Sequence, residues 1–343
     1  MQPSLAVAGL LLSFALPLLL LILAMPRFIR HLVKSGRVVD DVHKRPPTRV
    51  PLPVGPLLFL GALAGEILVY LAFGSFVPLA VMGGAAIAFA IGLADDLFVL
   101  GGKTKPLLLL LAAVPIMVSV IFQRDLFKAS LTFPLLGPTG AHFTIYALLV
   151  IVAFPVVANA FNMMDSFNGQ ISGFTLLTSL ALLFGVVLHA ISDSSFSLAR
   201  VASVLPLVAV AAGFFVFNRY PSKAFDGNSG SLMLGTMFAS LAITGGVEIA
   251  AITAIIPAIL NSFYTLSSAR GFIERRKIAA RPTRLGEDGR MYASLEPSSP
   301  NTLIRLILLS GPLDERDLVK SVLILTAFAC LLSGAISVLT WVH

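Results

Sequence analysis

The chain has 343 residues, of which 57% are hydrophobic and 12% are charged, and its formal net charge is +7. Soluble globular domains carry about 25% charged residues, so this composition, with a mean hydropathy of +0.95, indicates an integral membrane protein. The single cysteine, Cys330, excludes a disulfide framework and a cysteine-based metal site.

Apolar segments of about 20 residues span the hydrocarbon core of a bilayer. The sequence predicts ten spans, at 4–25, 54–74, 76–94, 106–122, 143–161, 171–191, 200–217, 230–245, 247–267 and 319–341. The first resembles a secretion signal, but it is long and lacks a small-residue cleavage site before Pro26, which favours a span. We expect residues 1–343 to form one membrane-embedded domain, with 268–318 as a long cytoplasmic loop.

The basic residues are distributed unevenly among the predicted loops. Counted together with the adjoining span ends, alternate loops hold 21 of the 24 Lys and Arg residues, and the remaining loops and span ends contain only Arg124, Lys128 and Arg200. Positive charge marks the cytoplasmic side, so the pattern predicts an all-α polytopic protein with both termini outside. It also argues against a nucleic-acid partner. The outer loop 123–142 is expected to form a small β-hairpin.

Two adjacent carboxylates, Asp95 and Asp96, end the third span in the segment AIGLADDLFVLGGKTK, residues 90–105. A helix C-terminus carries partial negative charge, and neighbouring carboxylates repel each other. A cation is therefore needed, and Lys105 and a divalent metal are the available kinds. A solvated acidic loop beside the membrane is the alternative interpretation.

Amide and carboxylate side chains recur in the next cytoplasmic loop, in NAFNMMDSFNG. Asn159, Asn162, Asp165 and Asn168 are spaced every third residue. Their oxygen atoms suit a hard cation such as Mg2+. Helix capping and turn formation are the competing explanation.

The last two cytoplasmic loops carry features suited to anions. The segment DGNSGS, residues 226–231, offers backbone N–H groups near a helix start, which bind phosphate, although it is equally an ordinary turn. Arginine side chains bind phosphate oxygens bidentately; Arg281 and Arg284, flanking Pro282, are predicted to hold a ligand, and 275–277 to contact lipid headgroups. One membrane face thus gathers groups suited to a metal and a diphosphate, which indicates phosphoryl transfer.

Several motifs occur together in a familiar order: GLADD with Lys105, NAFNMMDSFNG, NRYPSKAFDGNSGS, RPTRL at 281–285 and NTLIRLILLSGPLDER at 301–316. In these motifs the chain resembles the polyprenyl-phosphate N-acetylhexosamine-1-phosphate transferase superfamily, in its dolichyl-phosphate N-acetylglucosamine-1-phosphotransferase branch. The resemblance implies transfer of a sugar-1-phosphate from a UDP-sugar to a polyprenyl or dolichyl phosphate, with release of UMP and with Mg2+ or Mn2+ as cofactor. That reaction is the first step of lipid-linked oligosaccharide synthesis for protein glycosylation.

The resemblance also implies residue roles. It makes Asp95, Asp96 and Lys105 catalytic, assigns substrate binding to Asp41, Lys44, Asp165, Asn168, Asp226, Arg281 and Arg284, and assigns metal binding to Asn162 and Asn228. An aspartate that orients or deprotonates the lipid phosphate and a covalent aspartyl intermediate both remain open.

Three positions depart from the family pattern. Asn228 stands where the family usually has an aspartate, Leu52 where the dolichol branch tends to have an acid, and Val99 where an asparagine often follows the aspartate pair. These departures leave open a weakly active or non-catalytic relative. A transporter is the other alternative, because Glu66 and Glu248 fall within or beside spans, but transport places charges near the bilayer midplane rather than at one surface.

The expected location is a prokaryotic, archaeal-type cell membrane with the catalytic face cytoplasmic, or the ER membrane of a eukaryote. The exact UDP-sugar, the lipid chain and homodimer formation are left open by the sequence.

Overall fold

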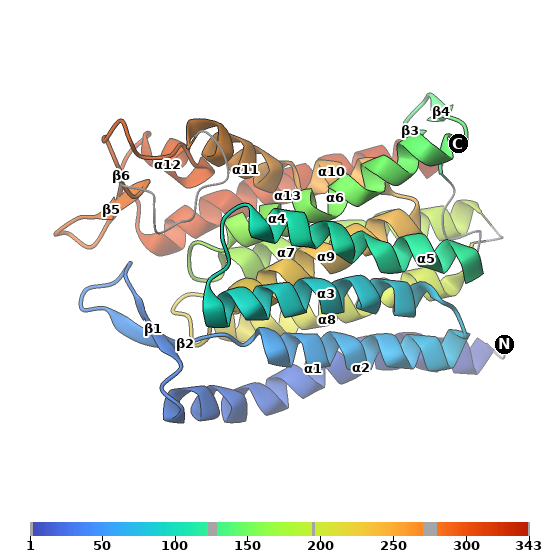
Figure 1. The fold of residues 1–343 in the computed structure, drawn as a ribbon, viewed down its shortest axis with the longest axis horizontal. Coiled ribbons are helices and arrows are strands. Elements are labelled where there is room, and N and C mark those ends of the chain that lie inside the picture. Colours follow the sequence, from blue (N-terminus) through green and yellow to red (C-terminus); the bar gives the residue numbers. More distant parts are fainter. Residues whose placement is uncertain (1–2, 123–128, 194–195, 270–279, 342–343) are drawn as a thin grey trace.

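The computed structural model describes residues 3–122, 129–193, 196–269 and 280–341, which form a mostly helical bundle with short β-hairpins (Figure 1). The long helices are α1 (Pro3–Lys34), α2 (Gly55–Phe73), α3 (Val77–Phe98), α6 (Phe143–Met164), α7 (Gln170–Ser192), α8 (Leu198–Asn218), α9 (Gly227–Gly245) and α13 (Glu315–Trp341). The shorter ones are α4 (Thr104–Leu109), the 3-10 turn η1 (Leu110–Ala113), α5 (Val114–Phe122), α10 (Glu248–Ala254), α11 (Ile256–Ser268) and α12 (Leu303–Leu308).

Seven helices within the described ranges are long and apolar enough to cross a membrane: α1, α2, α3, α6, α7, α8 and α13. The bent pair α10 and α11 raises the number to eight if it is one span. The expectation of a multi-pass helical protein is therefore confirmed. Ten spans with both termini outside stay a prediction.

Helix α9 lies at the centre of the bundle. All of its residues except Asn228 are buried, and it packs against α3, α6, α2 and α8. A helix enclosed by other helices does not face lipid, so it tolerates the small and polar residues that favour close helix packing. It begins at Gly227, three residues before the predicted span at 230–245, so Asn228 and Ser229 belong to its first turn.

Two of the predicted spans are interrupted in the structure. The segment 104–122 is divided into α4, η1 and α5, and α10 and α11 are bent by 65°. Pro257 lies in the first turn of α11, and a proline lacks the N–H needed to continue the preceding helix. The predicted span at 247–267 is therefore two helices.

The hairpins lie at opposite ends of the bundle (Figure 1). Strands β1 (Val38–Asp41) and β2 (Thr48–Pro51) lie at the same end as β5 (Thr283–Leu285) and β6 (Met291–Ala293), and each pair is antiparallel. The hairpin expected within 123–142 is present as β3 (Thr132–Phe133) and β4 (Gly137–Pro138). It lies at the other end of the bundle, the end that also carries the start of α1 and the end of α13.

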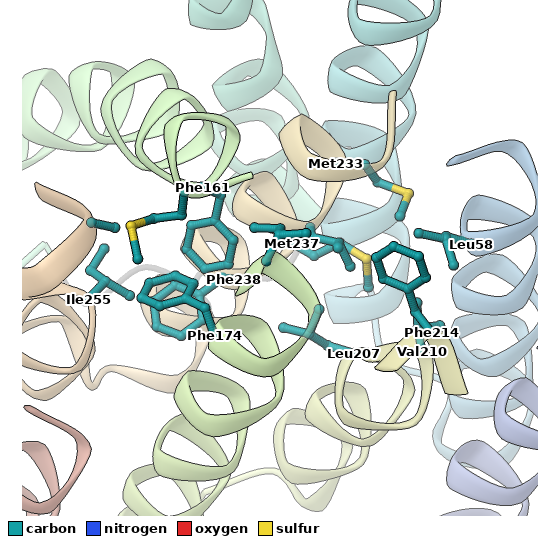
Figure 2. Close-up of a cluster of buried hydrophobic side chains, with 14 of the residues drawn as sticks. Leu58, Phe161, Phe174, Leu207, Val210, Phe214, Met233, Met237, Phe238 and Ile255 are labelled. Atoms are coloured by element: carbon teal, nitrogen blue, oxygen red, sulfur yellow. The ribbon is translucent and has the colours of Figure 1, made fainter. Parts of the chain in front are cut away.

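A fully buried aromatic cluster joins the three helices that lead to the polar end of the bundle (Figure 2). The ring of Phe161 on α6 lies 5.0 Å from that of Phe174 on α7 and 5.4 Å from that of Phe238 on α9. Such ring pairs stabilise a core beyond the area they bury. Because Phe161 directly precedes Asn162, this packing fixes the end of α6 that carries the polar residues.

Candidate functional site

The start of α9 holds the carboxylate of Asp96. Its Oδ1 accepts hydrogen bonds from the backbone N–H of Asn228 at 2.8 Å and from Asn228 Nδ2 at 3.0 Å. Its Oδ2 accepts from the backbone N–H of Ser229 at 3.0 Å and from Ser229 Oγ at 2.7 Å. The positive end of the α9 dipole thus compensates a carboxylate placed at the negative end of α3. The N–H groups predicted to bind phosphate bind Asp96 instead.

This contact depends on glycines that allow the two backbones to meet. A Cβ atom on Gly92 of α3 would lie 2.4 Å from the carbonyl oxygen of Asn228. Gly227 has a φ of +75°, a region that favours glycine, and a Cβ there would lie 2.7 Å from Asp96 Oδ2. The motif residues therefore serve helix packing as well as chemistry.

The neighbouring carboxylate, Asp95, is buried and faces a different partner. Lys105 Nζ lies 2.9 Å from Asp95 Oδ2, and the backbone N–H of Leu100 donates to Oδ1 at 2.6 Å. The cation that the sequence required for this carboxylate is thus Lys105. The two adjacent aspartates are compensated separately, one by a lysine and the other by a helix terminus.

Amide groups connect α6 to the same position. Asn162 Nδ2 donates to Asn228 Oδ1 and to Ser231 Oγ, each at 2.8 Å. Just beyond the end of α6, Asp165 lies beside Asp226, the residue that precedes α9. We call the set of Asp95, Asp96, Lys105, Asn162, Asp165, Asp226 and Asn228 the junction cluster, since it joins the ends of α3 and α6 to the start of α9.

Asp226 is fully buried, and neither of its carboxylate oxygens accepts a hydrogen bond from the described residues. Burial, followed by the negative charges of Asp165 and Asp96, raises the pKa of Asp226 well above its ordinary value. With Asn162 and Asn228 nearby, the junction cluster is rich in carboxylate and amide oxygens. This donor chemistry fits a hard divalent cation such as Mg2+.

A second polar cluster surrounds Asn168, which is 2% exposed. Its Oδ1 accepts from Lys44 Nζ at 3.0 Å and from the backbone N–H of Ser222 at 2.7 Å. Its Nδ2 donates to Asp41 Oδ2, and its backbone N–H donates to Glu315 Oε1, both at 3.0 Å. We call Asp41, Lys44, Asn168 and Glu315 the brace cluster, because it connects the β1–β2 loop, the α6–α7 loop and the start of α13.

Lys44 balances much of the negative charge in the brace cluster. It forms an ion pair with Asp41, and its Nζ lies 3.5 Å from Glu315 Oε2. Burial acts to raise the pKa of Asp41, but the hydrogen bonds from Lys44 and Asn168 outweigh it, so the pKa is lowered. Asp41, His43 and Glu315 bring three ligand atoms within 4.8 Å of one another, yet the Lys44 ammonium already provides a cation there.

The two arginines line a pocket beside the brace cluster. Arg281 and Arg284 border a cavity of about 310 Å³, together with His43 of the β1–β2 loop and Glu296. The Arg284 guanidinium stacks over the ring of Tyr292 at 4.9 Å. The pocket thus presents two arginine side chains to a ligand at the end of the bundle that carries β1–β2 and β5–β6.

The predicted residues fall into these three groups rather than one. Asp95, Asp96, Lys105, Asn162, Asp165, Asp226 and Asn228 meet in the junction cluster; Asp41, Lys44 and Asn168 meet in the brace cluster; Arg281 and Arg284 line the pocket. Asn159 belongs to none, because its Nδ2 bonds the carbonyl oxygen of Pro155 in its own helix. The basic run 275–277 lies outside the described residues.

Sequence reasoning missed Glu315 and His43. Glu315 stands at the start of α13 and accepts a hydrogen bond from the backbone N–H of Asn168. It lies in the motif at 301–316 and opens the last apolar segment, but neither feature assigned it a role. His43 stacks on Phe167 at 4.3 Å beside the pocket. Of the two acids that suggested transport, Glu66 is buried inside α2 and Glu248 accepts a hydrogen bond from Tyr146, apart from both clusters.

Long apolar helices whose polar side chains collect at one end define a multi-pass membrane protein with a polar site at the end of its bundle. The sequence model of glycosyl transferase family 4 matches residues 78–246, which include the whole junction cluster. The chain belongs to this family of transferases, which move a sugar-1-phosphate from a UDP-sugar to a polyprenyl phosphate.

Curated relatives agree with this membership. A Saccharolobus solfataricus protein, provisionally named a UDP-N-acetylglucosamine–dolichyl-phosphate N-acetylglucosaminephosphotransferase, is 25% identical over 294 residues, covering 85% of each chain. The Dictyostelium discoideum enzyme of that name is 25% identical over 68% of this chain and 62% of its own length. A phospho-N-acetylmuramoyl-pentapeptide-transferase of Listeria welshimeri is 27% identical, over 67% of this chain and 74% of its own.

Proposed function

We propose that the protein transfers N-acetylglucosamine-1-phosphate from UDP-N-acetylglucosamine to a polyprenyl or dolichyl phosphate and releases UMP. The observation that carries this proposal is the contact of Asp96, Asn162 and Asn228, three residues from distant motifs, at the end of one bundle. The names of the archaeal and Dictyostelium relatives support the sugar and the lipid. The reaction would begin lipid-linked oligosaccharide synthesis for protein glycosylation.

The proposal treats residues 1–343 as one membrane-embedded transferase, with 268–318 as its long cytoplasmic loop. The archaeal relatives favour the cell membrane of a prokaryote, and the distribution of basic residues favours a site that faces the cytoplasm.

In this reaction an oxygen of the lipid phosphate attacks the phosphorus that carries the sugar, and the bond from that phosphorus to UMP breaks. Asp95, held by Lys105, and Asp96, held by the start of α9, have fixed orientations from which to position the lipid phosphate. A divalent cation, when bound, supplies charge neutralisation for the diphosphate. Asn162, Asp165 and Asp226 are the oxygen donors available to hold it, whereas the amide of Asn228, which the resemblance assigned to the metal, bonds Asp96 and Asn162. The side chains therefore position groups and compensate charge rather than form covalent bonds.

The arginine pocket is proposed to hold the sugar-diphosphate. Arg281 and Arg284 carry forked donors that match phosphate oxygens, and the pocket they line opens beside the β1–β2 loop. The brace cluster would then act indirectly, since it fixes the loop that forms one wall of the pocket and the segment after Asp165.

The direct test uses the purified protein with Mg2+, dolichyl phosphate and a panel of UDP-sugars. UMP release and the lipid-linked product are measured together. We expect product with UDP-N-acetylglucosamine, little product with the other sugars, and none when the lipid phosphate is omitted. Preference for another UDP-sugar would contradict the sugar assignment, and UMP release without a lipid product would contradict the reaction.

One observation favours a non-catalytic relative as the second candidate. Asn228 stands at a position that the family pattern usually gives to an aspartate, and both ends of its amide are used inside the protein. An inactive parent chain together with an active Asn228→Asp variant would support this candidate. Activity of the parent would exclude it.

A further inference from the structure

Asp226 presents a buried carboxyl group that the described residues do not satisfy. The residue is fully buried, and both carboxylate oxygens lack a hydrogen-bond donor among the described residues. Buried polar groups in native proteins nearly always have partners, so an exception of this kind points to a group that binds there.

The surroundings of Asp226 make a cation the suitable partner. Asp165 and Asp96 both lie close enough to act on it electrostatically, and Asp165 directly follows α6, where the helix dipole favours positive charge. The half-buried side chains of Asp165 and Asp96 connect the site to the surface. In the brace cluster, Lys44 forms ion pairs with both carboxylates, Asp41 and Glu315. By contrast, the described lysines and arginines form no ion pair with Asp226.

The side chain of Asn228 bonds other residues of the protein rather than facing a cation. Its Nδ2 donates to Asp96 at 3.0 Å and its Oδ1 accepts from Asn162 at 2.8 Å. An amide bonded at both ends between α3 and α6 holds the helices in register and keeps Asp96 in place. It leaves the nearby carboxylate of Asp226 as the negatively charged oxygen donor at the start of α9.

We propose that Asp226, together with Asp165, is the carboxylate ligand of a divalent, oxygen-preferring cation such as Mg2+, and that Asn228 is a positioning residue for Asp96. This inference deepens the proposed function, since the cation would be the one that neutralises the substrate diphosphate. It moves the metal-binding carboxylate two residues upstream of the position expected from the family pattern.

The test measures metal binding alone, without substrates. The purified full-length chain in detergent is titrated with Mn2+, free Mn2+ is followed by electron paramagnetic resonance, and Mg2+ is added as competitor. We expect saturable binding of Mn2+ by the parent, at least tenfold weaker binding by Asp226→Asn, and a change of less than threefold for Asn228→Ala. The exposed Asp40 gives the matched control variant, Asp40→Asn, which should bind like the parent.

Thermal unfolding supplies an independent reading. In EDTA, Asp226→Asn should melt at a higher temperature than the parent because a neutral amide replaces a buried carboxyl group whose ionisation Asp165 and Asp96 oppose. Mg2+ should raise the melting temperature of the parent but not of the variant. Asp165→Asn, at the half-buried surface of the site, should also bind Mn2+ at least tenfold more weakly. Parent-like Mn2+ affinity in Asp226→Asn or in Asp165→Asn would overturn the inference, as would loss of binding in Asn228→Ala alone.

The two proposals fail separately. If Mn2+ binding depends on Asp226 but no UDP-sugar yields UMP, the proposed function fails and the cation site stands. If UMP is released and Mn2+ binding is indifferent to Asp226, the transfer reaction stands and the cation site fails.

Discussion

The brace cluster and the junction cluster are built from the same residue types but differ in how their charges are met. In the brace cluster, Lys44 contacts both Asp41 and Glu315, and the side chain of Asn168 bonds both Lys44 and Asp41. Glu315 Oε2 has no hydrogen bond among the described residues, but the Lys44 ammonium group 3.5 Å away compensates its charge. In the junction cluster, Asp226 is buried with no donor among the described residues. A buried polar network whose charges are compensated rigidifies a structure. One that is incomplete has room for a ligand.

This difference indicates a structural role for the brace cluster and a ligand-binding role for the junction cluster. The brace cluster holds the β1–β2 loop, the α6–α7 loop and α13 together. The junction cluster is proposed to present its oxygen atoms to a divalent cation that binds the substrate diphosphate. Substitutions should therefore divide into those that act mainly on stability and those that act mainly on turnover.

The largest expected effect is the loss of stability on removing Lys44. Lys44→Met leaves Asp41 and Glu315 in a largely buried position without their cation, which costs about 3–5 kcal/mol. Thermal unfolding in detergent should show a large fall in melting temperature. Addition of Asp41→Asn to this variant should restore part of the lost melting temperature. A melting temperature unchanged by Lys44→Met would show that the brace cluster does not stabilise the fold.

The next effect is on turnover. Asp96→Asn places an amide NH2 among the N–H donors of α9 and removes a charge at the site, so UMP release should fall by about 10²–10³, the usual result of losing one charged contact to a reacting group. The melting temperature should change far less than in Lys44→Met. Asp40→Asn serves as the control, and near-normal turnover in Asp96→Asn would remove this carboxylate from the site.

A smaller effect follows from separating the helices of the junction. Gly92→Ala would place a Cβ atom 2.4 Å from the backbone oxygen of Asn228, so α3 and α9 must move apart, at a cost of about 1–3 kcal/mol for an overpacked core. UMP release and melting temperature should both fall. Gly334→Ala is the matched control, since the nearest atoms to its added Cβ lie 3.7 Å away, and equal behaviour of the two variants would contradict the close approach.

The smallest effect is a gain. Val99 follows the aspartate pair with a φ of +56°, which is strained for a β-branched residue but accessible to asparagine. Val99→Asn should therefore stabilise the protein by about 1 kcal/mol without loss of turnover. A fall in melting temperature would show that valine is favoured there by packing.

The sequence predicts much of the helical framework because membrane helices are marked by long apolar runs. It predicts α9 and the α10–α11 pair least well. Helix α9 is enclosed by protein, so its composition does not follow lipid exposure, and the bend before Pro257 depends on a single residue. The β1–β2 and β5–β6 hairpins are too short to show a strand periodicity.

Candidate residues could be named from the sequence, but their grouping could not. Asn162 and Asn168 belong to the same series of polar residues spaced every third position. Because α6 ends at Met164, Asn162 lies on the helix and bonds Asn228 of α9, whereas Asn168 lies in the following loop and bonds Lys44. The partner of Asp96 could not be predicted from the sequence either. A helix terminus compensates charge with backbone N–H groups, which every residue has and no sequence motif marks.

We propose that the ends of α3 and α6, the start of α9 and the arginine pocket form one site for a sugar nucleotide. The most direct measurement is an experimental structure of the protein with Mg2+ and a bound UDP-sugar. We expect the diphosphate between the junction cluster and Arg281 or Arg284, with the ion on Asp226 and Asp165. A nucleotide bound at the opposite end of the bundle, near β3 and β4, would contradict it.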